Sequence, residues 1–204
     1  MKAVIGKYAL CAVLNAVLVG AAGTAFAGAH TWVVNEVFSN KSGTIQFVEL
    51  RESGGGAGET GLPGLTVSSS LHSTGLGGGS LTPPTSNKFF LIATPDFAAL
   101  PGAPAPNITL PAGSVPFFSK TGDTVSYNPY DSFAFGVVPT NGVNSLNRVG
   151  GVLPNSPTNY AGVSGSVVAP SPAPSLNEWG MGLAVAMLLL AGTAVVLRSR
   201  ATAT

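Results

Sequence analysis

The sequence predicts an all-β fold for the central part of the chain, arranged as a sandwich or a barrel. Its 204 residues include 27 glycines and 16 prolines, a content that favours turns and short strands over long helices. Strand-length runs follow one another between residues 31 and 149, and no amphipathic helix separates them. Each end of the chain instead carries an uncharged apolar stretch. We therefore expect one β domain flanked by an N-terminal signal helix and a C-terminal transmembrane helix.

The first predicted element is a β-hairpin. Residues 31–38 and 44–51 are rich in β-branched and aromatic side chains, which is typical of strands. The sequence Asn40-Lys41-Ser42-Gly43 separates the two runs with residues that favour turns.

Five further short runs are predicted to be strands because Gly, Pro, Asn or Asp bounds each of them. They are residues 65–68, 88–93, 124–127, 132–137 and 145–149. Residues 53–61 and the Ser/Gly-rich residues 68–80 are predicted to be surface loops.

Short motifs in these strands resemble a known domain family. They are Val34-Asn35-Glu36-Val37, then Gln46-Phe47-Val48-Glu49-Leu50, then Leu62-Pro63-Gly64-Leu65-Thr66-Val67. In this order they are similar to the Asn-Glu-Val strand, the Phe-Val-Glu-Leu strand and the Leu-x-Gly-x-x-Leu turn of lamin-tail-like domains, although the customary tryptophan is absent. The resemblance covers about residues 32–159 and implies an immunoglobulin-like β-sandwich, which we assign to residues 28–164. Such domains are accessory modules on bacterial surface and secreted proteins, so the resemblance informs architecture more than activity.

The N-terminus has the organisation of a secretory signal peptide. Two lysines precede an apolar run at residues 8–19, and Ala25-Phe26-Ala27 supplies the A-x-A pattern of a signal peptidase site. Cleavage would remove residues 1–27 and start the mature chain at Gly28. The alternative is an uncleaved anchor helix. The only cysteine, Cys11, lies in this leader, so the mature chain has no thiol for a disulfide, a thiolate metal site or a nucleophile.

The C-terminus is predicted to enter the membrane. Residues 165–178 form a linker rich in Pro, Ala and Ser, and residues 179–197 carry no charge over about the length that crosses a bilayer. Arg198 and Arg200 follow at once, and basic residues favour the cytoplasmic side. We therefore expect the β domain outside and residues 198–204 as a basic cytoplasmic tail.

The junction between linker and membrane segment resembles a bacterial sorting signal. Pro174, Leu176, Trp179 and Gly180 match the IPTL-type motif Ile-Pro-Thr-Leu-x-x-Trp-Gly, while Ala173 and Ser175 replace its Ile and Thr. The resemblance implies processing near the motif by an exosortase, a membrane-embedded transpeptidase-like enzyme. The alternative is a permanent single-span anchor.

Charge and motif composition argue against several functions. Residues 28–178 contain five bases and eight acids, a poor footprint for binding nucleic acid. The G-x-G-x-x-G string at residues 56–61 is followed by Pro63 and Gly64 rather than by the helix that a dinucleotide site needs. His30 and His72 lack a zinc-ligand pattern, and no G-x-S-x-G elbow is present. We therefore predict that the protein is not an enzyme and needs no cofactor or metal.

Two groups of residues leave an alternative open. Glu36 and Glu49 lie on the neighbouring strands of the hairpin, and with Asp123 or Asp131 they could collect Ca²⁺. Tyr127 and Tyr130 flank Asn128-Pro129 and could form an exposed rim that stacks on a glycan.

Taken together, these features predict an exported, non-enzymatic envelope or extracellular surface protein with a structural or adhesive role. Its partners would be signal peptidase, the exosortase, the inner membrane and a surface polysaccharide. It would reside in the cytoplasmic membrane, with release to the cell surface after processing. The alternative function is a carbohydrate-binding surface module, with Ca²⁺ as its optional ion.

Overall fold

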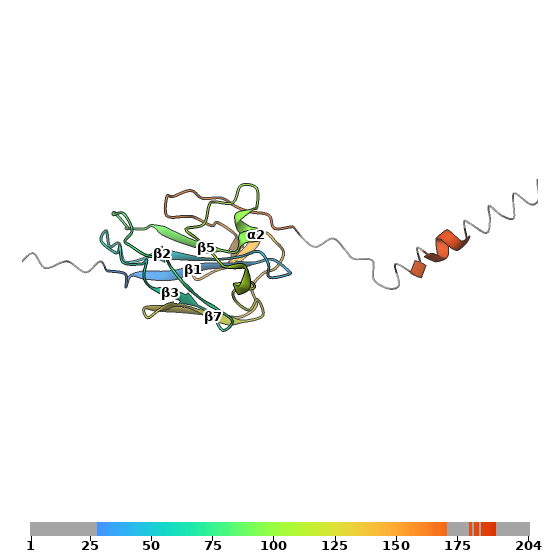
Figure 1. Ribbon diagram of the computed structural model, residues 1–204, viewed down its shortest axis with the longest axis horizontal. Helices are drawn as coiled ribbons and strands as arrows, with labels where there is room; N and C mark the ends of the chain where they lie inside the picture. The colour runs from blue at the N-terminus through green and yellow to red at the C-terminus, as the bar shows by residue number, and fades with distance from the viewer. Residues whose placement is uncertain (1–27, 171–179, 181, 184, 191–204) are drawn as a thin grey trace, which may run out of the picture. The chain divides into compact units, whose positions relative to one another are not determined.

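The protein is an all-β sandwich in which two sheets face each other (Figure 1). The computed structural model describes residues 28–170, 180, 182–183 and 185–190. One sheet has six strands in the order β10 (Gly151–Pro154), β9 (Asn144–Asn147), β1 (Trp32–Ser39), β2 (Gln46–Glu52), β5 (Phe89–Ala93) and β6 (Ile108–Thr109). The other has four, in the order β4 (Ser73–Gly75), β3 (Thr66–Ser68), β7 (Asp123–Asn128) and β8 (Asp131–Phe135). Two short helical turns, α2 (Pro95–Ala98) and η1 (Ala112–Ser114), complete the described elements of the domain.

The predicted N-terminal hairpin is confirmed. Strands β1 and β2 pair antiparallel, with a register shift between Val34 and Glu36 that marks a bulge at Asn35. In the turn, the Asn40 side-chain oxygen accepts the N–H groups of Gly43 and Ile45 at 2.8 and 3.1 Å. Gly43 has a φ of 82°, a conformation that glycine adopts without steric cost.

The main core lies between the two sheets. It consists of apolar and aromatic side chains from both layers, among them Trp32, Val34, Val48, Leu50, Val67, Phe90, Ile92, Phe117, Phe118, Val125 and Tyr127. Strand β7 shows the period-two pattern that produces this core, because Val125 and Tyr127 are fully buried while Thr124 is exposed. Phe133 and Phe135 of β8 also pack against this core.

A second core covers the outer face of the six-stranded sheet. Phe47 stacks on Phe38 with ring centroids 5.4 Å apart and meets Phe97 of α2 edge-on at 5.3 Å. Val167 and Ala169, near the end of the domain, pack into the same cluster. Because both faces of this sheet are covered, β2 is buried at every position except Arg51.

Residues 155–169 form a strap that belongs to the domain. The Asn155 side chain holds its two ends together, since its amide group donates to Val167 O at 2.7 Å and its oxygen accepts Val167 N at 2.8 Å. Ala169 N donates to Gly142 O at 2.8 Å. The domain therefore extends to Ala169, and the predicted boundary at residue 164 is corrected, because residues 165–169 are held by the fold.

All seven predicted strands occur, but the fold contains three that the sequence did not indicate. Strand β4 lies inside residues 68–80, so the prediction that this whole segment is a loop is wrong. Strand β4 pairs antiparallel with β3, with Thr66 opposite Gly75 and Ser68 opposite Ser73. The hydrogen bonds to β3 outweigh the preference of this Ser/Gly-rich segment for turns. Strands β6 and β10 are two and four residues long, and each lies at an edge of the six-stranded sheet.

The described C-terminal residues 180, 182–183 and 185–190 are helical. Within the described part of the chain, no helix is both long enough and apolar enough to cross a membrane. The leader with Ala25 and Ala27, the motif residues Pro174, Ser175, Leu176 and Trp179, and the arginines Arg198 and Arg200 lie outside the described residues. Their predicted roles therefore stay predictions.

Candidate functional site

Of the two tyrosines predicted to form an exposed rim, Tyr127 is buried and Tyr130 is exposed, so the prediction is wrong for Tyr127. Tyr127 is fully buried, and its hydroxyl donates to Ala29 O at 2.6 Å. Burial, with the Tyr130 and Glu59 groups adding to it, raises the pKa of Tyr127. Strand alternation places Tyr127 on the same inward face as Val125, so it serves the core and not the surface.

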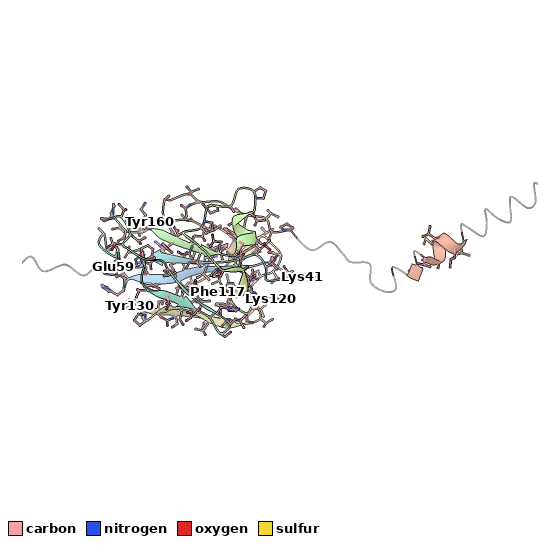
Figure 2. All side chains as sticks on the ribbon, in the orientation of Figure 1. Lys41, Glu59, Phe117, Lys120, Tyr130 and Tyr160 are labelled. Carbon is pink, nitrogen blue, oxygen red and sulfur yellow. The ribbon has the colours of Figure 1, made fainter. Side chains whose placement is uncertain are left out.

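Tyr130 is the exposed member of the pair. It is 49% exposed, its ring centroid is 5.8 Å from that of Tyr127, and the His30 ring lies 6.4 Å away in an edge-on contact. Figure 2 places Tyr130 and Glu59 at one end of the domain and Lys41 and Lys120 at the opposite end. One exposed tyrosine beside an exposed histidine offers much less stacking area than the predicted two-ring rim.

Glu36 and Glu49 do share a face, but they bind the strap. They are direct partners across β1 and β2, and both are almost completely buried. Glu36 accepts Ser156 N at 3.0 Å and the Ser156 hydroxyl at 3.1 Å. Glu49 accepts Thr158 N at 2.7 Å and the Asn35 amide at 2.7 Å. The two carboxyls thus fix residues 156–158 to the outer face of the six-stranded sheet.

The burial of this pair changes its acidity. Burial raises the pKa of Glu36, although hydrogen bonds from Ser145 and Ser156 act in the opposite direction. Burial and the neighbouring Glu36 carboxyl together raise the pKa of Glu49 to about 8, against the opposing effects of its hydrogen bonds and of Arg51. At neutral pH the pair therefore holds at least one proton, which reduces the repulsion between two adjacent carboxylates.

The predicted calcium option does not assemble. Asp123 accepts the N–H groups of Ser70, Ser119 and Thr124, and Asp131 forms an ion pair of 2.5 Å with Arg148. Among the residues that the structure describes, no three His, Cys, Asp or Glu side chains converge in a way that could hold a metal ion.

Asp131 and Arg148 form hydrogen bonds with backbone groups of β1 beside the bulge. Strand β9 pairs with β1 only at Glu36 and Val37, which leaves the backbone of Val34 outside this ladder. Asp131 accepts Val34 N at 2.8 Å, and Arg148 Nε donates to Val34 O at 2.6 Å. The ion pair thus links the β8 end of one sheet to β1 of the other.

The glycine-rich loop at residues 53–61 is organised around a carboxylate rather than around a ligand. Glu52 is fully buried and accepts the N–H groups of Gly54, Gly55 and Gly56 at 2.9–3.1 Å. Burial alone would raise its pKa, but these bonds, with those from Asn87 and Thr31, outweigh burial and lower the pKa of Glu52. The loop amides that a nucleotide phosphate would need are therefore already used.

The histidines and serines do not form a catalytic pair in the described chain. His30 Nδ1 lies 3.5 Å from Glu59 Oε1, and the backbone of His72 hydrogen-bonds to the N–H group and the hydroxyl of Ser69. The Ser69 hydroxyl accepts the N–H groups of Leu71 and His72 and donates to Phe117 O, so it organises its own turn.

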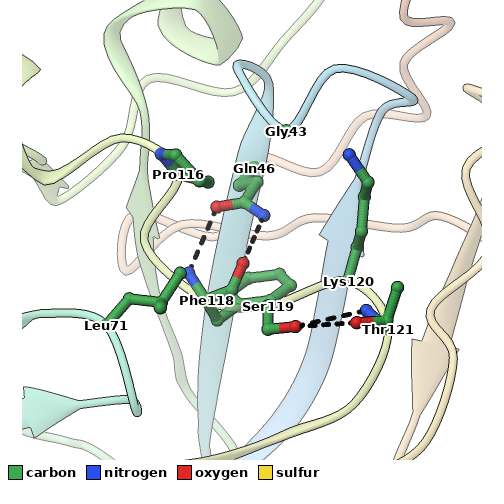
Figure 3. Close-up of a pocket in the computed structure, with 8 residues that line it drawn as sticks. All are labelled: Gly43, Gln46, Leu71, Pro116, Phe118, Ser119, Lys120 and Thr121. Atoms are coloured by element: carbon green, nitrogen blue, oxygen red, sulfur yellow. Dashed lines mark hydrogen bonds between the residues drawn. The ribbon is translucent and has the colours of Figure 1, made fainter.

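The remaining candidate is a hollow of about 260 Å³ at the end of the domain opposite Tyr130 (Figure 3). Its lining comes from the 43–46 segment, from Leu71 and from residues 116–121, and consists of Gly43, Gln46, Leu71, Pro116, Phe118, Ser119, Lys120 and Thr121. Gln46 is buried and forms its base. The Gln46 side chain donates to Phe118 O at 3.0 Å and accepts Phe117 N at 2.7 Å, which fixes the 117–118 segment to β2.

A second, wider hollow adjoins it on the outer face of the four-stranded sheet. Small polar residues line it, together with one aromatic ring: Ser68, Ser69, Ser70, Gly122, Asp123, Thr124, Ser126, Ala134 and Phe135. The Asp123 carboxylate there is held by the loop amides described above, and these bonds outweigh burial and lower the pKa of Asp123. It stays ionised at neutral pH.

Sequence reasoning missed the hollow at Lys120. Its lining residues are separated by up to 78 positions, and residues 116–121 carry no recognised motif. The available signal was the position of Lys41 in the predicted turn at residues 40–43 and of Lys120 shortly before the predicted strand at residues 124–127.

No protein-family model, curated protein or solved structure matches the chain. The lamin-tail-like and sorting-signal resemblances therefore depend on the short motifs in the sequence alone.

Proposed function

We propose that this chain is an exported, non-enzymatic protein of the cell envelope or extracellular surface, with a structural or adhesive role. Its signal peptide directs export, and its C-terminal segment inserts in the inner membrane with the β-sandwich outside. The sandwich is immunoglobulin-like and of the lamin-tail type. An exosortase acts at the motif around Pro174, Leu176, Trp179 and Gly180 and releases the domain to the surface.

The observation that carries the non-enzymatic part is the use of the acidic side chains. Of the seven acids in residues 28–170, six accept at least one backbone N–H: Glu36, Glu49, Glu52, Glu59, Asp123 and Asp131. A carboxyl that acts as a general acid, a general base or a nucleophile must face the substrate. These six instead fix loops and the strap, which supports a scaffold that displays a surface.

The positions of the domain's ends also support display. Gly28 O accepts Gly61 N, and Thr31 O accepts Ser53 N beside the start of β1. At the other end of β1, Asn40 forms a bridge with Asn141, and Gly142 O accepts Ala169 N. The chain therefore enters the domain at the start of β1 and leaves it near the end of β1. The surface around the entry point is thus far from the exit toward the C-terminal segment and is available for display.

Protease accessibility in intact cells tests the export and topology. With the protein expressed in its native host, external protease should degrade the β domain while a cytoplasmic control protein survives. A variant with Lys2 and Lys7 replaced and the apolar run at residues 8–19 interrupted by charges should stay protected in the cytoplasm. Equal protection of the wild-type domain and the cytoplasmic control would overturn the proposal.

A further inference from the structure

One lysine, Lys120, lines the hollow, a second, Lys41, lies at the same end of the domain (Figure 2), and no described carboxylate forms an ion pair with either. The described residues contain two ion pairs, His30–Glu59 and Arg148–Asp131, and neither involves a lysine. The other basic residues of the domain differ in their surroundings. Arg51 and Lys88 lie over the rings of Phe89 and Tyr160, whereas Lys120 Nζ donates to Lys41 O at 2.7 Å.

That single bond leaves the Lys120 ammonium with donors to spare. An ammonium has three N–H donors, so two remain for a ligand at the mouth of the hollow. The bond also joins the 41–44 turn to the 119–121 turn, so both lysines belong to one end of the domain. The nearest acid along the chain, Asp123, is committed to four hydrogen bonds from Ser70, Ser119 and Thr124.

The walls of the hollow combine apolar and hydroxyl groups. Leu71 is 46% exposed, Pro116 is exposed, and the buried Phe118 ring lies behind them. Across from these residues, the Ser119 and Thr121 hydroxyls lie 3.1 Å apart (Figure 3). A sugar ring has an apolar face and a polar edge, and a pocket for it needs the same two kinds of surface together.

The base of the hollow is rigid before any ligand arrives. Gln46 is 1% exposed, and in addition to its bonds with Phe117 and Phe118 its amide donates to the Ser39 hydroxyl at 3.1 Å. A site fixed in this way loses little conformational entropy on binding.

We propose that this hollow binds one acidic sugar residue of an extracellular polysaccharide. Lys120 binds the anionic group, Ser119 and Thr121 contact the ring hydroxyls, and Leu71 and Pro116 contact the apolar ring face. Its volume of about 260 Å³ lies below that of pockets for drug-sized ligands, which begin at about 300 Å³, and so suits a single ring. The encounter with such a polymer rests on the proposed export, but the binding itself does not.

Charge favours a polysaccharide over a membrane or a nucleic acid as the partner. Lipid recognition by lysines uses clusters of about four to eight basic residues, and nucleic-acid binding also needs many phosphate contacts. This end of the domain offers two lysines, and residues 28–170 carry seven acids against five bases. One cation beside an apolar wall is enough to bind a single charged sugar of a chain, but too few to bind the phosphates of a nucleic acid or the surface of an anionic membrane.

The test is calorimetric titration of the full chain, in mild neutral detergent, with oligogalacturonate. A neutral glucan oligosaccharide of the same length and glycerol 1-phosphate, which carries the anionic group of a phospholipid headgroup, are titrated in parallel. We expect saturable binding of oligogalacturonate, none of the glucan, and weakening with added salt. Lys120→Gln should lower the affinity about tenfold, because it removes a charge-assisted hydrogen bond.

Two matched variants guard against a folding artefact. Lys41→Gln changes a side chain for which the structure gives no hydrogen bond, ion pair or ring contact, so it should fold normally and lower the affinity by a smaller factor. Lys88→Gln removes a lysine from the Tyr160 site and should leave the affinity unchanged. Absence of oligogalacturonate binding, binding of glycerol 1-phosphate alone, or equal losses in all three variants would each overturn the proposal. None of these results depends on export, which the protease experiment measures separately.

Discussion

Replacing Glu49 by glutamine should remove most of the pH dependence of stability above pH 5. Glu49 is 1% exposed, lies directly opposite Glu36, and has a pKa of about 8 against an ordinary value of 4.5. The folded protein therefore binds more protons than the unfolded chain between pH 4.5 and 8. Stability from this group is fully present below pH 4.5 and is lost as the pH rises through 8.

The size of the effect follows from the difference between the pKa of Glu49 in the folded protein and its ordinary value. Each pH unit within this window costs about 1.4 kcal/mol of unfolding free energy, so the wild-type protein should lose about 3–4 kcal/mol between pH 5 and pH 8. Glutamine resembles the protonated acid in shape and hydrogen bonding. Glu49→Gln should therefore unfold within about 1 kcal/mol of the wild type at pH 5 and be more stable at pH 8 by about 2–3 kcal/mol.

Urea unfolding of the full chain in mild detergent, followed by the fluorescence of the buried Trp32, measures both profiles. Asp96→Asn, at an exposed position of α2, is the control and should keep the wild-type profile. Below pH 4 all three proteins should lose stability together, because Glu52 and Asp123 have lowered pKa values and must then take up protons. Parallel profiles for the wild type and Glu49→Gln between pH 5 and 8 would contradict the raised pKa of Glu49 in the folded protein.

Two further variants test the core and the contact between the sheets. Tyr127→Phe leaves the buried Ala29 carbonyl without its donor and should lower the free energy of unfolding in urea by about 1–3 kcal/mol. The control Tyr130→Phe, at an exposed ring, should change it by less than about 0.5 kcal/mol. Equal effects of the two variants would contradict the buried position of Tyr127. Asp131→Asn weakens the link to Arg148, whose side chain is partly exposed, and should lower the free energy of unfolding by about 1–2 kcal/mol. In high salt the difference from the wild type should be smaller. A loss of stability that does not depend on salt would argue against an ionic contribution.

The sequence was sufficient for the strands that carry their own pattern. Residues 31–38 and 44–51 contain β-branched and aromatic residues on both sides of a recognisable turn, and they pair as expected in β1 and β2. Strand β4 has no such pattern, because Ser73, Thr74 and Gly75 become a strand only through pairing with β3. Alternation from Val125 could have placed Tyr127 inward, but its position beside Asn128-Pro129 suggested an exposed turn.

The roles of the acids could not be read from the sequence in the same way. Scattered carboxylates on strands are usually solvated, and nothing local indicates that Glu36 and Glu49 are covered. They are buried because the strap returns over the outer face of the sheet about 110–120 residues later, at Ser156 and Thr158. The hollow at Lys120 depends in the same way on contacts between distant segments.

The most direct test of the proposed function is the intact mass of the protein recovered from its native host. The wild type is compared with a Pro174→Ala/Trp179→Ala variant of the sorting motif. We expect the wild type to lack both the leader, with Gly28 as its first residue, and the C-terminal segment, while the variant lacks only the leader. If both proteins retain the C-terminal segment, the tail is a permanent anchor and the sorting step is contradicted.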